Sequence, residues 1–377
     1  MDLSLSEEQE IIKNNARSFL KKECSMTFVR KLEEDDEAFS PELWKKMADL
    51  GWMGMIIPFD HGGIEGNFLD LVVLLEEMGR VCAPSWLFST SILGAQVILR
   101  TGTEEQKEKW LPAIAAGESK GTLAMIEPQS GYDVTKIEMT YDSDGNGFSI
   151  SGLKLFVPDA HIADWIICVT KGKEGKESEP TLGLFIIDGK APGISITPLK
   201  NISAEKIFEV KFDGVKVPAE NLLGGKEQNA KDLERILQEA SLAKCAEMVG
   251  GAQAVLEMSA DYAKQRVQFG RPIGSFQAIQ HHCANMQIDL DCSRYLTYYA
   301  AWMLSEGMPC EKEIAMAKAF TSKAYTRITT LGQEIHGGTG VITEHDMQIY
   351  YRRAKAYALS LGNATFQREI IARQMGF

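Results

Sequence analysis

Residues 144–152 read Asp-Gly-Asn-Gly-Phe-Ser-Ile-Ser-Gly, and this stretch decides the fold class. Its first half has the composition of a hairpin turn, and its second half alternates apolar and polar residues as a half-buried strand does. Apolar runs at 165–169 and 184–187 predict two buried strands joined through a polar loop, and residues 207–212 alternate again. The sequence therefore predicts an all-β domain over residues 119–222.

Helical patterns flank this β domain on both sides. Ser6 and Thr103 each precede a glutamine by three residues, which is the spacing of a capping box. After the β domain, residues 228–267 and 275–306 keep a helical period without proline, which indicates a helical bundle. We expect an α+β chain with a helical domain over 1–118, the β domain over 119–222 and a helical bundle over 223–377.

The composition excludes several classes of protein. The 377 residues carry 40 Lys+Arg against 52 Asp+Glu, and this net charge of −12 argues against a nucleic-acid-binding surface. No apolar run reaches the roughly 18 residues of a membrane span, and the acidic start is unlike a signal peptide. Seven cysteines without a C-x-x-C spacing predict reduced thiols and a cytoplasmic location. The adjacent His281 and His282 would point about 100° apart on a helix, so we expect no metal site there.

Two glycine-containing stretches stand out in the second helical region. Residues 266–272, Arg-Val-Gln-Phe-Gly-Arg-Pro, interrupt two long helices with a cationic and aromatic turn. An arginine and the N–H groups at the start of a helix could bind a diphosphate, although the same turn could simply connect two helices. Residues 335–340, Ile-His-Gly-Gly-Thr-Gly, permit close approach of a ligand or of another subunit.

At these two stretches the chain resembles the acyl-CoA dehydrogenase family, and the similarity covers essentially its whole length. The most specific parts run from Tyr262 to Gln280 and from Ile335 to Lys355. The resemblance implies an N-terminal helical domain, a central β-barrel domain and a C-terminal four-helix bundle, with FAD as the cofactor. It also implies dimers or dimers of dimers. The residues expected to contact FAD are Arg266 and Phe269 at its diphosphate and adenine side, Gln268 and Gln277 nearby, and Gly337 and Gly338 toward the FAD of a neighbouring subunit.

The reaction implied by this resemblance is α,β-desaturation of an acyl-CoA thioester. A carboxylate removes the α proton while the β hydrogen leaves as hydride to the flavin, and the electrons pass to electron-transferring flavoprotein. The expected partners are therefore an acyl-CoA substrate, electron-transferring flavoprotein and a homologous dehydrogenase subunit.

Three positions depart from the family pattern. The position of the usual C-terminal glutamate is Leu361, which cannot accept a proton. Ile126 replaces a hydroxyl at the flavin pyrimidine edge, and Pro158 replaces a threonine near flavin N5. Together these changes indicate loss of a complete active site. With this pattern of substitutions, the chain most resembles the small subunit of pimeloyl-CoA dehydrogenase and subunits of heteromeric acyl-CoA dehydrogenases.

Some family members place the base on the long helix before the Arg-Val-Gln-Phe-Gly turn, at the position of Ala240 here. Glu247 lies seven residues further, nearly two helical turns, and so shares the face of Ala240. It stands in an apolar run, and we expect it to be buried, either as a base or as the partner of a lysine or arginine. Glu239, one residue from Ala240, is a second candidate base, about 100° around the helix.

These observations leave three hypotheses. In the first, the chain is an FAD-dependent dehydrogenase subunit that works with a non-identical partner on a dicarboxylic, branched or cyclic acyl-CoA. In the second, it is a self-sufficient homotetramer with Glu247 as the base. In the third, it is a non-catalytic structural subunit that completes the FAD site of a catalytic partner.

Overall fold

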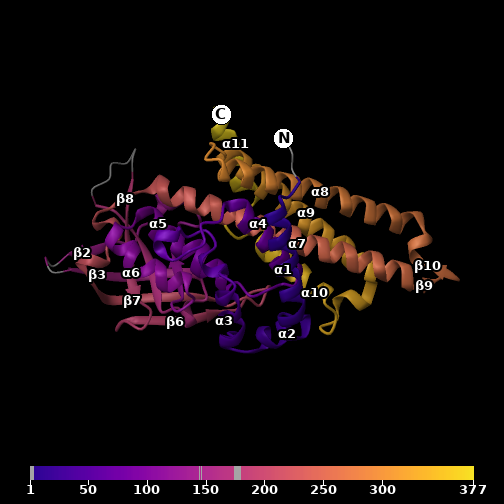
Figure 1. The fold of residues 1–377 in the computed structure, drawn as a ribbon, viewed down its shortest axis with the longest axis horizontal. Coiled ribbons are helices and arrows are strands. Elements are labelled where there is room, and N and C mark those ends of the chain that lie inside the picture. The colour runs from indigo at the N-terminus through magenta and orange to yellow at the C-terminus, as the bar shows by residue number, and fades with distance from the viewer. Residues whose placement is uncertain (1–3, 144, 146, 174–179) are drawn as a thin grey trace. The chain divides into compact units, whose positions relative to one another are not determined.

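The computed structural model describes residues 4–143, 145, 147–173 and 180–377, which form two compact units (Figure 1). The helical unit contains residues 4–30, 67–83 and 241–377, and the β unit contains residues 31–66 and 84–240. Each unit is therefore assembled from segments that are far apart in the sequence. Asp144 and Asn146 of the expected turn, and residues 174–179 of the expected polar loop, lie outside the described residues.

The described part of the β unit holds two four-stranded sheets. One has the order β1–β4–β5–β8, with β1 parallel to β4. The other has the order β2–β3–β7–β6 and is antiparallel. The predicted strands at 165–169, 184–187 and 207–212 are confirmed as parts of β4, β5 and β7. The strand bounds are β1 Gly121–Ala124, β2 Tyr141–Ser143, β3 Gly147–Pro158, β4 Trp165–Lys171, β5 Thr181–Asp188, β6 Ile194–Leu199, β7 Ile207–Pro218 and β8 Gln228–Asn229.

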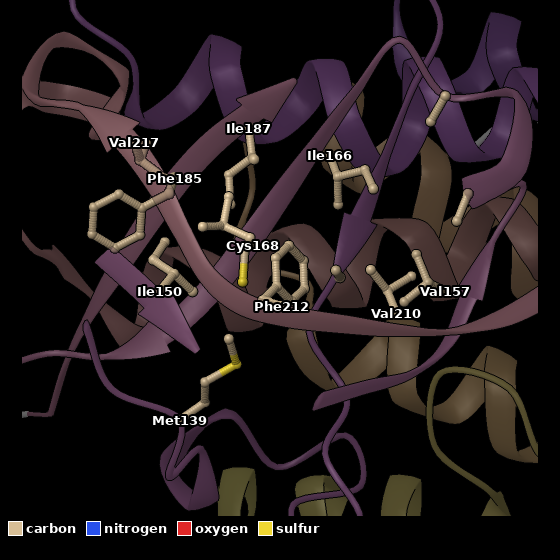
Figure 2. Close-up of a cluster of buried hydrophobic side chains, with 14 of the residues drawn as sticks. Met139, Ile150, Val157, Ile166, Cys168, Phe185, Ile187, Val210, Phe212 and Val217 are labelled. Carbon is tan, nitrogen blue, oxygen red and sulfur yellow. The ribbon is translucent and has the colours of Figure 1, made fainter. Parts of the chain in front are cut away.

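Apolar side chains from both sheets meet in one buried cluster (Figure 2). Cys168 and Phe185 come from the first sheet, and Ile150 and Phe212 come from the second. Aromatic rings add directional packing, since the centroids of Phe148 and Phe185 lie 5.0 Å apart in an edge-on arrangement. This core fixes β3 in place, and the C-terminal end of β3 carries Pro158.

The N-terminal segments of the β unit contribute the helices α3 (Pro41–Asp49), α5 (Gln96–Thr101) and α6 (Glu104–Ala115). The predicted capping box at Thr103 is confirmed. The Thr103 hydroxyl accepts from the N–H of Gln106, and the side-chain oxygen of Gln106 accepts from the N–H of Thr103. A buried π-helix, η3 (Phe88–Ala95), was not predicted.

The helical unit is a bundle in which α9 packs against α8, α10 and α11, and α4 packs against α1 and α8 (Figure 1). The two long predicted helices are confirmed as α7 and α8, within three residues of the expected ends. The division between the units falls within α7, after residue 240. The helix bounds are α1 Glu7–Glu23, α2 Met26–Glu34, α4 Phe68–Arg80, α7 Ala230–Gln265, α8 Gln277–Ser305, α9 Glu311–His336, α10 Met347–Tyr357 and α11 Ala364–Gln374.

Two expectations from composition concern the whole chain. Across the described ranges, no helix combines the length and the apolar character needed to cross a bilayer. The cysteines form no disulfide within the same ranges.

Candidate active site

Helices α4 and α7 of the helical unit cross at two glycines, where their backbones nearly touch. A Cβ on Gly79 would lie 2.0 Å from the carbonyl oxygen of Glu247, and a Cβ on Gly250 would lie 1.8 Å from that of Glu76. Only glycine fits at these positions without moving a helix. The crossing therefore places Glu247 directly beside the last turn of α4.

A small cavity that is partly open to solvent lies beside this crossing. The end of α4 and the residues after it contribute a mostly apolar wall, whereas α7, α9 and α10 contribute polar side chains. The interior is narrow and has room for about one water molecule. The lining residues are Met78, Gly79, Cys82, Ala83, Glu247, Tyr325, Arg353 and Tyr357.

Glu247 is the carboxylate of this cavity. It is only 8% exposed, and Lys244 Nζ, one turn earlier on α7, donates to its Oε2 at 2.8 Å. The same ammonium lies 4.4 Å from the centre of the Tyr357 ring. The structure thus buries Glu247 and pairs it with a lysine. Such a carboxylate faces a cavity and is shielded from bulk water, and both properties suit a base that acts on a bound substrate.

Glu239, the second candidate, belongs to the β unit. Its two carboxylate oxygens accept from Nη2 of Arg100 at 2.7 and 2.6 Å, and Nε of Arg235 lies 3.5 Å away. Burial raises the pKa of this carboxyl above its usual range, and the two arginines oppose that shift. Glu239 is not part of the cavity wall that contains Glu247. Its double pairing is typical of a structural ion pair.

Leu361, at the usual base position of the family pattern, lies in the connection between α10 and α11. Its backbone adopts the left-handed region with φ of 55°, and its side chain is buried. Its carbonyl oxygen accepts from Nε2 of Gln367 at 2.9 Å. An isobutyl group accepts no proton, so this connection contributes backbone shape and not a base.

Arg266, Gln268 and Phe269 lie on an exposed hairpin between α7 and α8. The strands β9 (Val267–Gln268) and β10 (Arg271–Pro272) pair antiparallel across it. Phe269 occupies the turn with φ of 54° and is 90% exposed. The hairpin therefore presents an aromatic ring and a cationic side chain to the surroundings.

The chain after this hairpin carries the fourth predicted FAD residue. The guanidinium of Arg271 lies 4.2 Å from the centre of the Phe276 ring, which supports the base of the hairpin. Gln277 is the first residue of α8, and its side chain is exposed.

The structure brings the two glycine-containing stretches together. α9 ends at His336, Gly337 has φ of 58°, and a Cβ on Gly337 or Gly338 would meet no atom within 4 Å. The rings of His336 and Tyr262 stack with centroids 4.4 Å apart. The carbonyl oxygen of Tyr262 in turn accepts from the N–H of Arg266 at 2.8 Å. One surface of the helical unit thus carries both stretches.

This surface fits the nucleotide half of FAD. An arginine and glutamines supply donors for a diphosphate, the exposed ring of Phe269 can stack on a base, and open glycine backbone permits close approach. Within the described part of the chain, Nε2 of His336 is buried without a hydrogen-bond partner. Such an atom is usually satisfied by water or by a ligand.

Two segments that the resemblance places near the flavin lie side by side in the β unit. The N–H of Leu155 donates to the carbonyl oxygen of Ile126 at 2.8 Å. A buried ion pair joins Lys154 Nζ to Glu127 Oε1 at 2.6 Å. Pro158 is the last residue of β3. The β unit therefore holds these segments firmly, although Ile126 and Pro158 offer no hydroxyl to a flavin.

Sequence reasoning missed most of the cavity wall. Tyr325, Arg353 and Tyr357 come from α9 and α10, many residues from Glu247, and they lie on no shared pattern in the sequence. The run Tyr-Tyr-Arg-Arg-Ala-Lys at 350–355 belongs to the family resemblance. It could have pointed to this wall, but the resemblance implied no role for Arg353.

Comparison with known proteins matches the acyl-CoA dehydrogenase N-terminal domain to residues 6–118, the middle domain to 122–215 and the C-terminal domain to 232–376. The probable acyl-CoA dehydrogenase YngJ of Bacillus subtilis is 33% identical, with 100% of both chains covered. CarC, a subunit of the caffeyl-CoA reductase-Etf complex of Acetobacterium woodii, is 31% identical over 97% of this chain and 98% of its own length.

A solved structure extends this similarity to three dimensions. The ChsE4-ChsE5 complex from Mycobacterium tuberculosis matches with a TM-score of 0.90 and 26% identity, covering 100% of this chain and 99% of the other. The chain therefore belongs to the acyl-CoA dehydrogenase family, whose members are FAD flavoproteins and oxidoreductases acting on CH–CH groups.

Proposed function

We propose that this chain is an FAD-dependent acyl-CoA dehydrogenase subunit that desaturates the α,β bond of an acyl-CoA thioester and passes the electrons to electron-transferring flavoprotein. The observation that carries the proposal is the position of Glu247. Its buried carboxylate lines a cavity next to Arg353 and Tyr357, in a family whose reaction needs a base. The similarity to a subunit of an Etf complex supports the electron-transfer partner.

Different residues of this chain would bind the cofactor and remove the proton. Bound FAD would supply the acceptor for the β hydrogen. The hairpin with Arg266, Gln268 and Phe269, together with Gly337–Gly338, would hold the nucleotide half of a neighbouring subunit's FAD. Glu247 would take the α proton.

The geometry at Glu247 supports this role. Lys244 holds Oε2, which leaves Oε1 as the oxygen that would receive the proton. The apolar wall from the end of α4 would exclude water from the reacting carbons.

The experiment that tests this proposal replaces Glu247 with Gln. The amide keeps the size of the side chain but cannot accept the proton, so turnover with an acyl-CoA should fall by about 10²- to 10⁴-fold while the bound flavin remains. Glu239→Gln is the matched control, because it removes a buried carboxylate of the same helix outside the cavity, and turnover should change by less than about tenfold. Unchanged turnover in Glu247→Gln would reject the proposal.

We further propose that the partner subunit is a homologous but non-identical dehydrogenase and that the complex works in the cytoplasm on a dicarboxylic, branched or cyclic acyl-CoA. Leu361, Ile126 and Pro158 leave a site that a second chain would have to complete. The similarity to the ChsE4-ChsE5 complex supports a two-chain assembly.

A second candidate function is a non-catalytic subunit that completes the FAD site of its partner. It is favoured by the ion pair between Glu247 and Lys244 and by the narrow cavity, since both also suit a purely structural carboxylate. This candidate predicts a complex whose activity is insensitive to Glu247→Gln, so the same variant separates the two functions.

A further inference from the structure

Lys318 of α9 is a fully buried lysine that holds the chain at the end of α10. It has 0% exposure. Its Nζ donates to the carbonyl oxygen of Tyr357 at 2.9 Å, to Oγ of Ser322 at 3.1 Å and to the carbonyl oxygen of Gly362 at 3.4 Å. All three acceptors are neutral oxygens, so the ammonium is satisfied without being paired to a carboxylate through these bonds.

Burying the ammonium of Lys318 destabilises the fold. Taking an ammonium out of water costs several kcal/mol unless an anion compensates it. The pKa of Lys318 is lowered to about 8, mainly by burial; Cys245 opposes this shift and Lys244 adds to it. A residue that reduces the stability of the fold is expected where it serves a site, because sites often carry local costs that the rest of the molecule offsets.

The two carbonyls that Lys318 holds belong to the turn formed by residues 357–362. Tyr357, at the start of the turn, contributes to the cavity wall. Leu361, near its end, stands at the family's usual base position and has the left-handed backbone described above. Gln367 holds the carbonyl oxygen of Leu361 from α11. Lys318 from α9 thus holds both ends of this turn, and Gln367 from α11 holds the residue before its last one.

The ring of Tyr357 contacts a second lysine. Lys244, the partner of Glu247, lies 4.4 Å from the ring centre. The carbonyl and the ring of one residue are therefore fixed by two different lysines, one from α9 and one from α7. A change in the turn would move the ring, and with it one wall of the cavity beside Glu247.

We propose that Lys318 is a positioning residue of this cavity, because it fixes the turn at residues 357–362 and thereby sets the distance between Tyr357 and Glu247. The proposal rests on the proposed function only in taking the cavity as the acyl-CoA site. The effect of Lys318 on the turn itself is independent of what the cavity binds.

The test replaces Lys318 with Met, which has a similar length and no donor. Amide hydrogen exchange is followed by mass spectrometry on the full-length protein with any partner retained. Loss of donors to two buried carbonyls should speed exchange of the turn and of the last turn of α10 by about tenfold. Exchange in α7 should remain within about twofold of the wild type, and the KM for an acyl-CoA should rise by about tenfold with a smaller change in kcat.

Ser322→Ala provides the matched control, because it removes a hydroxyl acceptor of Lys318 and leaves the ammonium and both carbonyl bonds in place. Its turn should exchange within about threefold of the wild type. Equal exchange of the turn in wild type and Lys318→Met would overturn the proposal, and so would a loss of protection spread evenly over the whole bundle. If the turn loosens but the KM stays unchanged, the positioning role for the acyl-CoA site is wrong. Glu247→Gln has no bearing on the exchange result, so failure of the proposed base would be recognised separately.

Discussion

At the scale of single residues, Lys318 should leave a signature in the pH dependence of stability. Its pKa is about 8 in the folded chain, against 10.5 for an ordinary lysine. Between these two values the unfolded chain binds more protons than the folded chain, so the free energy of unfolding rises with pH, by up to about 3 kcal/mol from this group. We expect urea unfolding at pH values below and above this window to show the gain in the wild type and not in Lys318→Met. A difference between the two proteins that stays constant with pH would contradict this expectation.

At the scale of helices, the crossing of α4 and α7 depends on Gly250. A Cβ at this position would lie 1.8 Å from the backbone oxygen of Glu76, which cannot move without shifting α4. Gly250→Ala should therefore reduce the free energy of unfolding by about 2–4 kcal/mol in denaturant titrations. Gly251→Ala is the matched control, because its Cβ would meet the hydroxyl end of the Tyr325 side chain. The end of a side chain yields more readily than a helix backbone, so the loss should be smaller, and equal losses would show that the crossing is not as tight as described.

Some helices and strands could be predicted from the sequence and others could not. The capping box at Thr103 and the strands β4, β5 and β7 were predictable, because each depends on residues close together in the chain. The parallel pairing of β1 with β4 was not, since it joins residues 121–124 to residues 165–168 through a long connection. The π-helix at 88–95 was also missed, because its apolar and hydroxyl residues have no periodic signature of their own.

The candidate site was predictable in the same uneven way. Glu247 was proposed as the base because it shares a helical face with Ala240, and the FAD-contacting residues were proposed because their stretches resemble a family; both assignments stay predictions. Lys318 was missed, since the two carbonyl oxygens that it holds lie 39 and 44 residues further along the chain. The stacking of His336 on Tyr262, which unites the two glycine-containing stretches, is likewise a tertiary contact. The division into domains at 118 and 222 stays a prediction.

At the scale of the whole molecule, the surface that we propose for FAD is exposed, and we propose that a second subunit completes it. Phe269, Gly337 and Gly338 lie open, and Ile126 and Pro158 offer no hydroxyl to a flavin. We expect the chain purified alone to contain much less than one FAD per chain and to gain flavin when co-purified with a homologous partner. Flavin absorbance and native mass together measure this. One FAD per chain in a homo-oligomer would instead favour the self-sufficient enzyme.

The most direct test of the central claim, that Glu247 is the base, measures proton removal apart from oxidation. The flavin-loaded complex is incubated in D₂O with an acyl-CoA analogue that has no hydrogen on its β position, so that desaturation cannot follow, and α deuterium is measured by mass spectrometry. The wild type and Glu239→Gln should incorporate deuterium, whereas Glu247→Gln should do so at least about 10²-fold more slowly with its flavin still bound. Equal incorporation in Glu247→Gln and the wild type would show that the base lies elsewhere.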